Sequence, residues 1–289
     1  MLSSTSNSNQ IDVILGAFVF ALLLLVAYHF LIVLRLVPAG EGETAYSTNC
    51  SRIENYALAK TTPEKVALGS SELNRAIIQT FDPGMVNLCM IGQGAIDGLS
   101  IIALTKRYPK AVLIEADSTL GVRPTNIVEE ALPFYKRVLI GLSPVFRTCY
   151  KPSGIVLKLC ANLFPPAPQP PADPEVIKIS KQHWLVDEPD RAGLNSNLTT
   201  LKSMVDEMQK QGTVVCFVDI PLDPIIYNGK VEAGSRQIIE EYFPRSQYIW
   251  LGPTIKKVWT TVDGLHLTGG DAVAFERDIE HQLYMILHK

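Results

Sequence analysis

A regular alternation of short apolar segments and helix-length segments runs through most of the chain after residue 62. The apolar segments are rich in β-branched residues, as is typical of strands buried on both faces, and they lie at 65–68, 86–91, 111–116, 213–220 and 248–251. Segments with the length of helices lie between them, at 72–80, 95–108, 198–211 and 235–242. This alternation predicts an α/β fold, a three-layer α/β/α sandwich with a mostly parallel five-stranded sheet.

A second feature is an uncharged run of 22 residues, 13–34, which only Tyr28 and His29 interrupt. At about 1.5 Å of rise per residue, a helix of this length crosses a hydrocarbon layer about 30 Å thick. The tail before it has no Lys or Arg, unlike a cleaved signal peptide. We therefore expect an N-terminal tail at 1–11, an uncleaved transmembrane helix at 12–36 and a linker at 37–61.

The orientation of this helix depends on few charges. Arg35 and Arg52 follow the apolar run, and by the positive-inside rule they weakly favour a cytoplasmic domain. The net charge of −3 leaves no broad basic field for a phosphate backbone, so we expect no nucleic-acid partner. Of the five cysteines, Cys149 and Cys160 are candidates for a disulfide in an oxidising compartment.

Residues 133–189 interrupt the alternation and are predicted to be an insertion in a domain that spans 62–289. The first part of the insertion mixes aromatic, aliphatic and basic residues, and a proline-rich run at 165–174 suits neither helix nor inner strand. Two interpretations of the basic, apolar part remain open. It is either a pair of helices packed on the core, or a surface that lies on anionic lipid or on a membrane partner.

The chemistry of the chain centres on Ser71, which follows the first predicted strand, where ligands of parallel sheets bind. A serine hydroxyl becomes a nucleophile when an imidazole accepts its proton and a carboxylate orients that imidazole. Asp263 and His266, three residues apart with the flexible Gly264 between them, supply both groups. We therefore expect Ser71, His266 and Asp263 to be nucleophile, base and orienting group.

Simpler interpretations of the same residues stay open. Ser70 or Ser71 has the residue type and position of a helix N-cap, and the Asp263–His266 step has the form of a turn at a helix start. A later Asp278-Ile-Glu-His281 step is expected to form a solvated helix face.

Stabilisation of an oxyanion needs backbone amides that approach the serine. The amide of Ser71 lies at a helix start, and Gly92 and Gly94 follow the second predicted strand. These three residues are the candidate oxyanion groups, although glycines at such positions are also ordinary turn residues. The chemistry requires no cofactor and no metal, and none is predicted.

Taken in order, these motifs resemble the SGNH (GDSL-like) hydrolase superfamily, over residues 62 to about 287. Gly69-Ser70-Ser71 is similar to its first block, Gly92 or Gly94 to its second-block oxyanion glycine, and Asp263-Gly-Leu-His266 to its last block. The third block departs from the pattern, since no Gly-x-Asn-Asp follows residues 112–117. The resemblance implies a flavodoxin-like sandwich and a Ser71–His266–Asp263 triad.

The amino-terminal apolar run and the Gly-Ser-Ser-Glu start are similar to membrane-anchored members of that superfamily that serve surface-polymer acylation. Examples are the proteins of teichoic acid D-alanine transfer and of alginate and cellulose O-acetylation. The resemblance implies a single-pass protein of the cytoplasmic membrane whose catalytic domain lies in the periplasm or extracellular space. It also implies an acyl or acetyl transferase or esterase on an exported polysaccharide, beside a multispanning acyltransferase or polysaccharide synthase.

Two other functions remain open at this point. The absent third-block asparagine favours an inactive scaffold that recruits a synthase or acyltransferase. The basic insertion suits a lipid-directed esterase.

Overall fold

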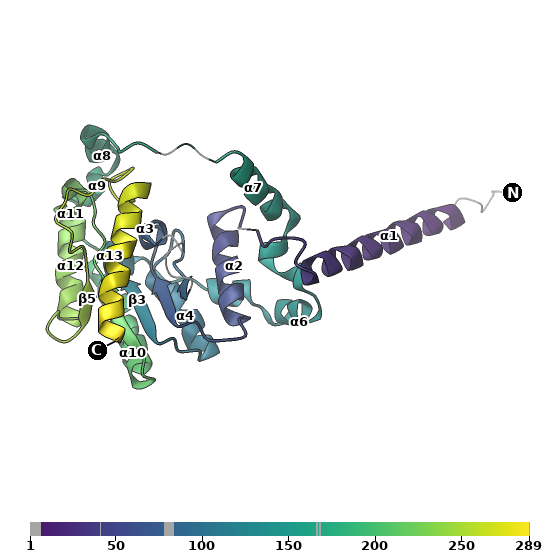
Figure 1. The fold of residues 1–289 in the computed structure, drawn as a ribbon, viewed down its shortest axis with the longest axis horizontal. Helices are drawn as coiled ribbons and strands as arrows, with labels where there is room; N and C mark the ends of the chain where they lie inside the picture. Colours follow the sequence, from purple (N-terminus) through teal and green to yellow (C-terminus); the bar gives the residue numbers. More distant parts are fainter. Residues whose placement is uncertain (1–6, 41, 78–83, 166, 168, 289) are drawn as a thin grey trace. The chain divides into compact units, whose positions relative to one another are not determined.

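The structure, a computed structural model, describes residues 7–40, 42–77, 84–165, 167 and 169–288 (Figure 1). Residues 1–6 of the expected tail and 78–80 of the expected helix at 72–80 lie outside the described residues. The chain divides into two compact units. Unit 1 comprises Met1–Glu43 and Leu132–Pro165, and unit 2 comprises Thr44–Ala131 and Pro166–Lys289.

Unit 2 contains a five-stranded parallel sheet, as the alternation predicts. Its strands are β1 (Lys65–Leu68), β2 (Met85–Asn87), β3 (Ala111–Glu115), β4 (Val214–Val218) and β5 (Ile249–Leu251). They pair in the order β2-β1-β3-β4-β5, and every pair is parallel. The chain passes from β1 to β2 on one side of β1 and then crosses to β3 on its other side, so the strand order reverses between β1 and β3, and the carboxyl ends of strands at such a reversal are a common ligand site.

The helices of unit 2 surround this sheet. They are α2 (Ala45–Ala57), α3 (Ser71–Ala76), α4 (Ala95–Thr105), α5 (Ile127–Ala131), α8 (Pro174–Ser180), α9 (Gln182–Val186), α10 (Arg191–Lys210), α11 (Pro224–Tyr227), α12 (Lys230–Tyr242) and α13 (Gly269–Leu287), with a 3-10 turn η1 (Ser118–Gly121). The observed α3, α4, α10 and α12 overlap the four helices expected from the sequence, with shifted ends.

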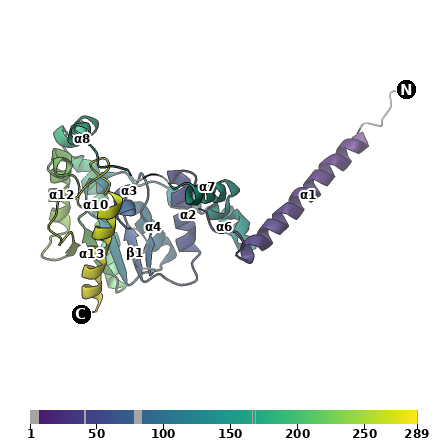
Figure 2. The same ribbon diagram turned by 45° about the horizontal axis from the view of Figure 1, so that its top comes forward.

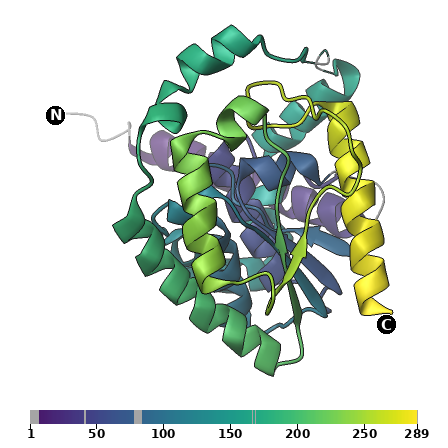
Figure 3. The same ribbon diagram turned by 90° about the vertical axis from the view of Figure 1, so that its left-hand side faces the viewer.

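Both faces of the sheet are covered, which explains the continuous apolar pattern of the strands. Cys216 and Val218 of β4 share a buried cluster with Phe275 of α13. Phe217, between them in sequence, points to the other face, where its ring centroid lies 4.4 Å from that of Phe243 at the end of α12. Figure 3 shows α13, in yellow, on one side of the strands and α12, in green, on the other.

The prediction of a linker at 37–61 is wrong for its second half, because α2 forms part of unit 2. Thr44 caps this helix, and its hydroxyl accepts a hydrogen bond from the amide of Ser47. Asn49 exchanges two hydrogen bonds of 2.9 and 3.0 Å with the backbone of Ile91. The buried side of α2 is thus largely polar, and for that reason its composition resembles that of a tether.

Unit 1 consists of α1 (Asn7–Val33), α6 (Phe134–Leu142), the turns η2 (Pro144–Phe146) and η3 (Thr148–Tyr150), and α7 (Pro152–Leu163). Residues 10–33 of α1 form a helix of 24 residues that is long and apolar enough to cross a membrane. Figure 2 shows α1 extending away from α6 and α7 of the same unit. The expected insertion 133–189 therefore falls partly in unit 1 and partly, as α8 and α9, in unit 2.

Candidate active site

The segment that carries Asp263 and His266 is a narrow hairpin between β5 and α13. An antiparallel bridge pairs Thr261 with Leu267, and the amide of Val262 donates a 2.8 Å hydrogen bond to the carbonyl of His266. Gly264 at the tip has φ +93°, a left-handed conformation that a side chain disfavours. The hairpin therefore brings the aspartate and the histidine to one place through its own backbone.

Three hydrogen bonds fix Asp263 against His266. Asp263 Oδ1 accepts from the amides of Leu265 and His266 at 3.1 and 2.9 Å, and Oδ2 lies 2.8 Å from His266 Nδ1. Burial by itself would raise the pKa of Asp263, but the hydrogen bonds and charge of His266 outweigh burial and lower that pKa. An ionised Asp263 only accepts hydrogen bonds, so Nδ1 carries the ring proton in neutral His266 and Nε2 is left as an acceptor.

Ser71, the first residue of α3, meets that free ring nitrogen. Its Oγ lies 2.9 Å from Nε2 of His266, although the two residues are 195 positions apart in sequence. The N-cap of α3 is Ser70, whose hydroxyl accepts a 3.0 Å hydrogen bond from the amide of Glu72. Ser70 thus caps the helix while Ser71 contacts His266, and the structure brings Ser71, His266 and Asp263 into one hydrogen-bonded chain.

Glu115, the last residue of β3, holds the turn that presents Ser71. It is fully buried and accepts hydrogen bonds from the Ser70 hydroxyl, at 2.9 Å, and from the Ser70 amide. Gly69 makes this approach possible, because a Cβ at that position would lie 2.7 Å from Cβ of Glu115. The glycine of the Gly-Ser-Ser motif therefore makes room for a carboxylate that anchors the next residue.

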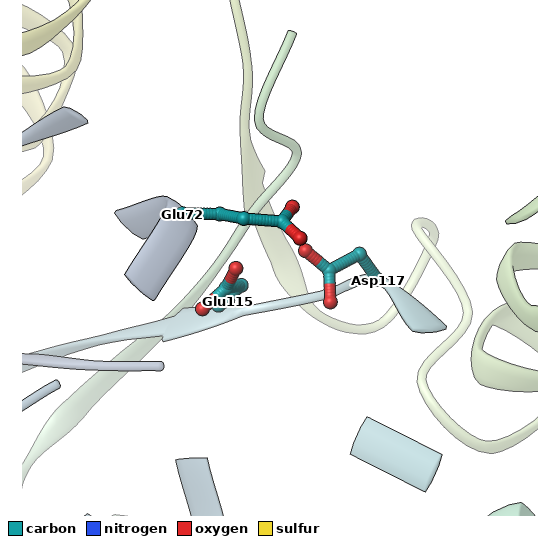
Figure 4. A group of neighbouring side chains, drawn as sticks. All are labelled: Glu72, Glu115 and Asp117. Carbon is teal, nitrogen blue, oxygen red and sulfur yellow. The ribbon is translucent and has the colours of Figure 1, made fainter. Parts of the chain in front are cut away.

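Glu115 belongs to a cluster with Glu72 and Asp117, each at least 95% buried (Figure 4). Figure 4 shows the three carboxyl groups turned toward one another, with Glu72 on α3, Glu115 at the end of β3 and Asp117 at the start of the turn η1. Burial first, and then the neighbouring carboxylates, raise the pKa of both glutamates well above the ordinary range. Three buried carboxyl groups this close cannot all ionise without a counter-charge, so the cluster keeps a proton at neutral pH.

The cluster is also the one group of acidic, His or Cys side chains among the described residues whose oxygens, within 4.8 Å of one another, are close enough to share a cation. However, both carboxylate oxygens of Glu115 already accept hydrogen bonds from Ser70. Asp117 Oδ1 likewise accepts from the amide and hydroxyl of Thr119, at 2.8 and 2.6 Å. The geometry is that of a hydrogen-bonded carboxyl cluster, and we interpret it in that way.

The candidate oxyanion residues lie after β2 on the serine side of the sheet. Beyond the strand the amide of Met90 donates a 2.7 Å hydrogen bond to the carbonyl of Gly69, so the backbone that leads to Gly92 runs beside the serine turn. Gly92 has φ +74°, and no atom lies within 4 Å of the position that a Cβ would take. Gly94 instead caps α4, and a Cβ there would lie 2.9 Å from the carbonyl of Thr119. Gly94 thus packs on the turn after β3, whereas the Cβ position of Gly92 is open.

A cavity of about 230 Å³ adjoins the hairpin of Asp263 and His266 at the carboxyl ends of β4 and β5. Its lining includes Ile220 and Leu222, and these residues share buried clusters with Leu267 and Leu265, the neighbours of His266. The remaining lining is formed by the aromatic rings, prolines and polar groups of Asp219, Pro221, Pro224, Tyr227, Asn228, Pro253 and Trp259.

The sequence analysis missed Glu115 and misplaced Asp278. The sequence signal for Glu115 was its residue type, since it is the one acidic residue in the otherwise apolar strand β3. Asp278 is buried rather than part of a solvated face, because its carboxylate accepts hydrogen bonds from the amide and hydroxyl of Thr254, each at 2.6 Å. All five cysteines are thiols rather than members of a disulfide, so Cys149 and Cys160 are not joined, and Cys160 is the exposed one.

No family model, curated protein or solved structure matches this chain.

Proposed function

We propose that the chain is a membrane-anchored serine esterase or acyl (acetyl) transferase of the SGNH type, with a three-layer, flavodoxin-like catalytic domain. The observation that carries the proposal is the continuous hydrogen-bonded chain from Ser71 Oγ through His266 to Asp263. Its distances of 2.9 and 2.8 Å lie within the range at which a base takes a proton from a nucleophile.

In the proposed reaction, Ser71 Oγ attacks the carbonyl carbon of an acyl ester and His266 Nε2 takes the hydroxyl proton. Asp263 stabilises the imidazolium, and the amides of Ser71 and Gly92 donate to the oxyanion. Collapse of this intermediate breaks the ester bond, and the leaving alcohol receives the proton from His266. A second alcohol or a water then attacks the acyl-serine with His266 as base, which regenerates the free serine.

The acceptor class that fits an anchored enzyme is an exported cell-surface polysaccharide, whose hydroxyl groups serve as acyl acceptors. Helix α1 supports anchoring at the membrane, since it is long and apolar enough to span it. In this proposal the catalytic domain lies in the periplasm or extracellular space, where it works with a multispanning acyltransferase or polysaccharide synthase.

An active-site probe tests the proposal. Full-length protein in detergent is treated with a fluorophosphonate, which reacts with activated serines, and is assayed with an aryl acetate. Labelling at Ser71 should be lost in both Ser71→Ala and His266→Ala, whereas Ser196→Ala, at an exposed position of α10, should label normally. Normal aryl acetate turnover by Ser71→Ala would rule out the proposed nucleophile.

A non-catalytic scaffold is the second candidate. It is favoured by the buried carboxyl groups of Glu115 and Asp117, which occupy the end of β3 where an oxyanion asparagine would be expected. Persistent absence of labelling in a folded sample would support the scaffold over the enzyme.

A further inference from the structure

Unit 1 exposes large apolar side chains on both of its short helices. On α6, Phe134, Tyr135 and Leu142 are 75, 67 and 73% exposed, and at the end of α7, Leu163 and Phe164 are 72 and 78% exposed. Soluble proteins seldom gather so many apolar side chains at their surface unless the surface contacts a partner or a membrane. The exposed apolar side chains of α6, α7 and the turns between them are called the α6–α7 surface below.

The charge of this segment has one sign. Residues 132–165 contain five basic residues and no Asp or Glu. The basic residues are Lys136, Arg137, Arg147, Lys151 and Lys158. Helices that combine apolar side chains with Lys and Arg suit the boundary of an anionic bilayer, where the apolar groups enter the acyl region and the cations contact phosphates.

The turns between α6 and α7 are attached to the carboxyl-terminal end of α1. The hydroxyl of Tyr28 donates a 2.6 Å hydrogen bond to the carbonyl of Tyr150, and His29 Nδ1 lies 2.8 Å from the hydroxyl of Ser143. Tyr28 and His29 are the polar interruption of the apolar run, close to the point where a membrane-spanning α1 would reach the headgroups. The α6–α7 surface is therefore tied to the helix end that would emerge from the bilayer.

We propose that α6 and α7 lie in the headgroup region of an anionic membrane, as a second membrane contact beside the spanning helix α1. The helices are too short to span, because even the 12 residues of α7 extend only about 18 Å. Net positive charge and direct attachment to α1 favour lipid over a protein partner as the occupant of the surface. The proposal does not depend on the chemistry of Ser71.

Cys160 offers a reporter at the centre of this surface. It is exposed, the other four cysteines are buried, and in α7 it lies three or four residues from Val156, Leu157, Leu163 and Phe164, hence on the same helix face. Full-length protein is labelled at Cys160 with an environment-sensitive fluorophore and reconstituted in vesicles of phosphatidylcholine and phosphatidylglycerol. Cys160→Ser measures labelling at any other site.

Lipids with a nitroxide near the headgroup should quench the fluorophore strongly, and aqueous iodide should quench it weakly. Omitting phosphatidylglycerol should make iodide quenching stronger than lipid quenching, and so should the double change Arg137→Glu with Lys151→Glu. The reason is that each basic residue contributes about a fivefold preference for an anionic surface. Leu163→Asp with Phe164→Asp changes exposed positions only, so folding should persist while lipid quenching is lost.

Strong iodide quenching with no lipid quenching would overturn the proposal. Protection from both quenchers would overturn it as well, because the surface would then be covered by protein. If that protection depends on protein concentration, a second copy of the chain covers the surface. If the protection does not depend on protein concentration, unit 2 covers it.

Discussion

Glu115 and Ser70 form a buried pair in which one carboxylate accepts both the amide and the hydroxyl hydrogen of the serine. This pair fixes the backbone immediately before Ser71, so the position of the proposed nucleophile depends on a carboxyl group of a neighbouring strand. The role of Glu115 in the proposed reaction is to position Ser71, since it does not touch the reacting atoms.

Replacement Glu115→Gln should therefore lower both stability and turnover. In Glu115→Gln, the side-chain NH₂ group faces one of the two hydrogen-bond donors of Ser70 and cannot accept from it. A buried donor that is left without an acceptor costs about 1–3 kcal/mol. A displacement of the nucleophile by about 1 Å costs on the order of 10²-fold in rate. The checks are thermal unfolding in detergent and kcat with an aryl acetate, where a fall in kcat at nearly constant KM is expected. Exposed Glu129→Gln is the control, and equal behaviour of the two variants would contradict the positioning role.

Replacement Asp263→Asn should leave the backbone of the hairpin intact but remove the ionised partner of His266. An amide donor facing Nδ1 selects the wrong tautomer, and in Ser-His-Asp enzymes this change costs roughly 10⁴-fold in kcat. We expect a loss of about 10³- to 10⁴-fold, whereas exposed Asp187→Asn should be neutral. A loss of less than tenfold would show that Asp263 does not orient the base.

The same aspartate predicts a loss of stability in acid. The pKa of Asp263 is lower in the folded chain than its ordinary value, so the stabilisation from Asp263 is complete above that ordinary value, about 3.9. It is lost as the pH falls through the folded pKa. The difference in unfolding midpoint between wild type and Asp263→Asn should therefore shrink between pH 5 and pH 2. A constant difference over this range would contradict the assignment.

Glu232 of α12 predicts the opposite pH dependence. Burial first, and then the charge of Asp117, raise the pKa of Glu232 to about 8. A raised carboxyl pKa destabilises the fold as pH rises above the unfolded value, because the unfolded chain ionises first. Stability should thus fall between pH 5 and pH 8, and Glu232→Gln should reduce that fall. An undiminished or steeper fall in this variant, measured by circular dichroism, would count against a protonated Glu232.

Gly264→Ala tests the tip of the hairpin that carries Asp263 and His266. A left-handed backbone costs a residue with a side chain about 1–2 kcal/mol. A Cβ at this position would also lie 3.0 Å from Ile177 and 3.1 Å from Ile226. Both stability and kcat should fall. Gly270→Ala is the matched control, since no atom lies within 4 Å of its Cβ position in α13, and it should be neutral or stabilising. Equal effects of the two changes would contradict strain at the hairpin tip.

The sheet and the approach of Ser71 to His266 were predictable, because apolar strands and short motifs at strand ends are local features of the sequence. Helix α2 was not, since its buried side carries the polar residues Ser47, Asn49 and Glu54, and Asn49 pairs with the backbone of Ile91, 42 positions away. The contact of Glu115 with Ser70 could not be predicted either, because these two residues also lie far apart in the sequence. Its partner is 45 positions away, and only the parallel pairing of β1 with β3 brings them together.

The base and its orienting carboxylate occupy a single hairpin, whereas the serine belongs to a separate strand end. The amide of Asp223 donates a 3.0 Å hydrogen bond to the carbonyl of Gly264, and Leu265 and Leu267 on either side of His266 are buried, so the imidazole and the carboxylate are held together by the packing of the hairpin. The 2.9 Å contact between His266 Nε2 and Ser71 Oγ is therefore the one link of this hydrogen-bonded chain that joins two separate segments, so its length reports how the hairpin packs against the strand end.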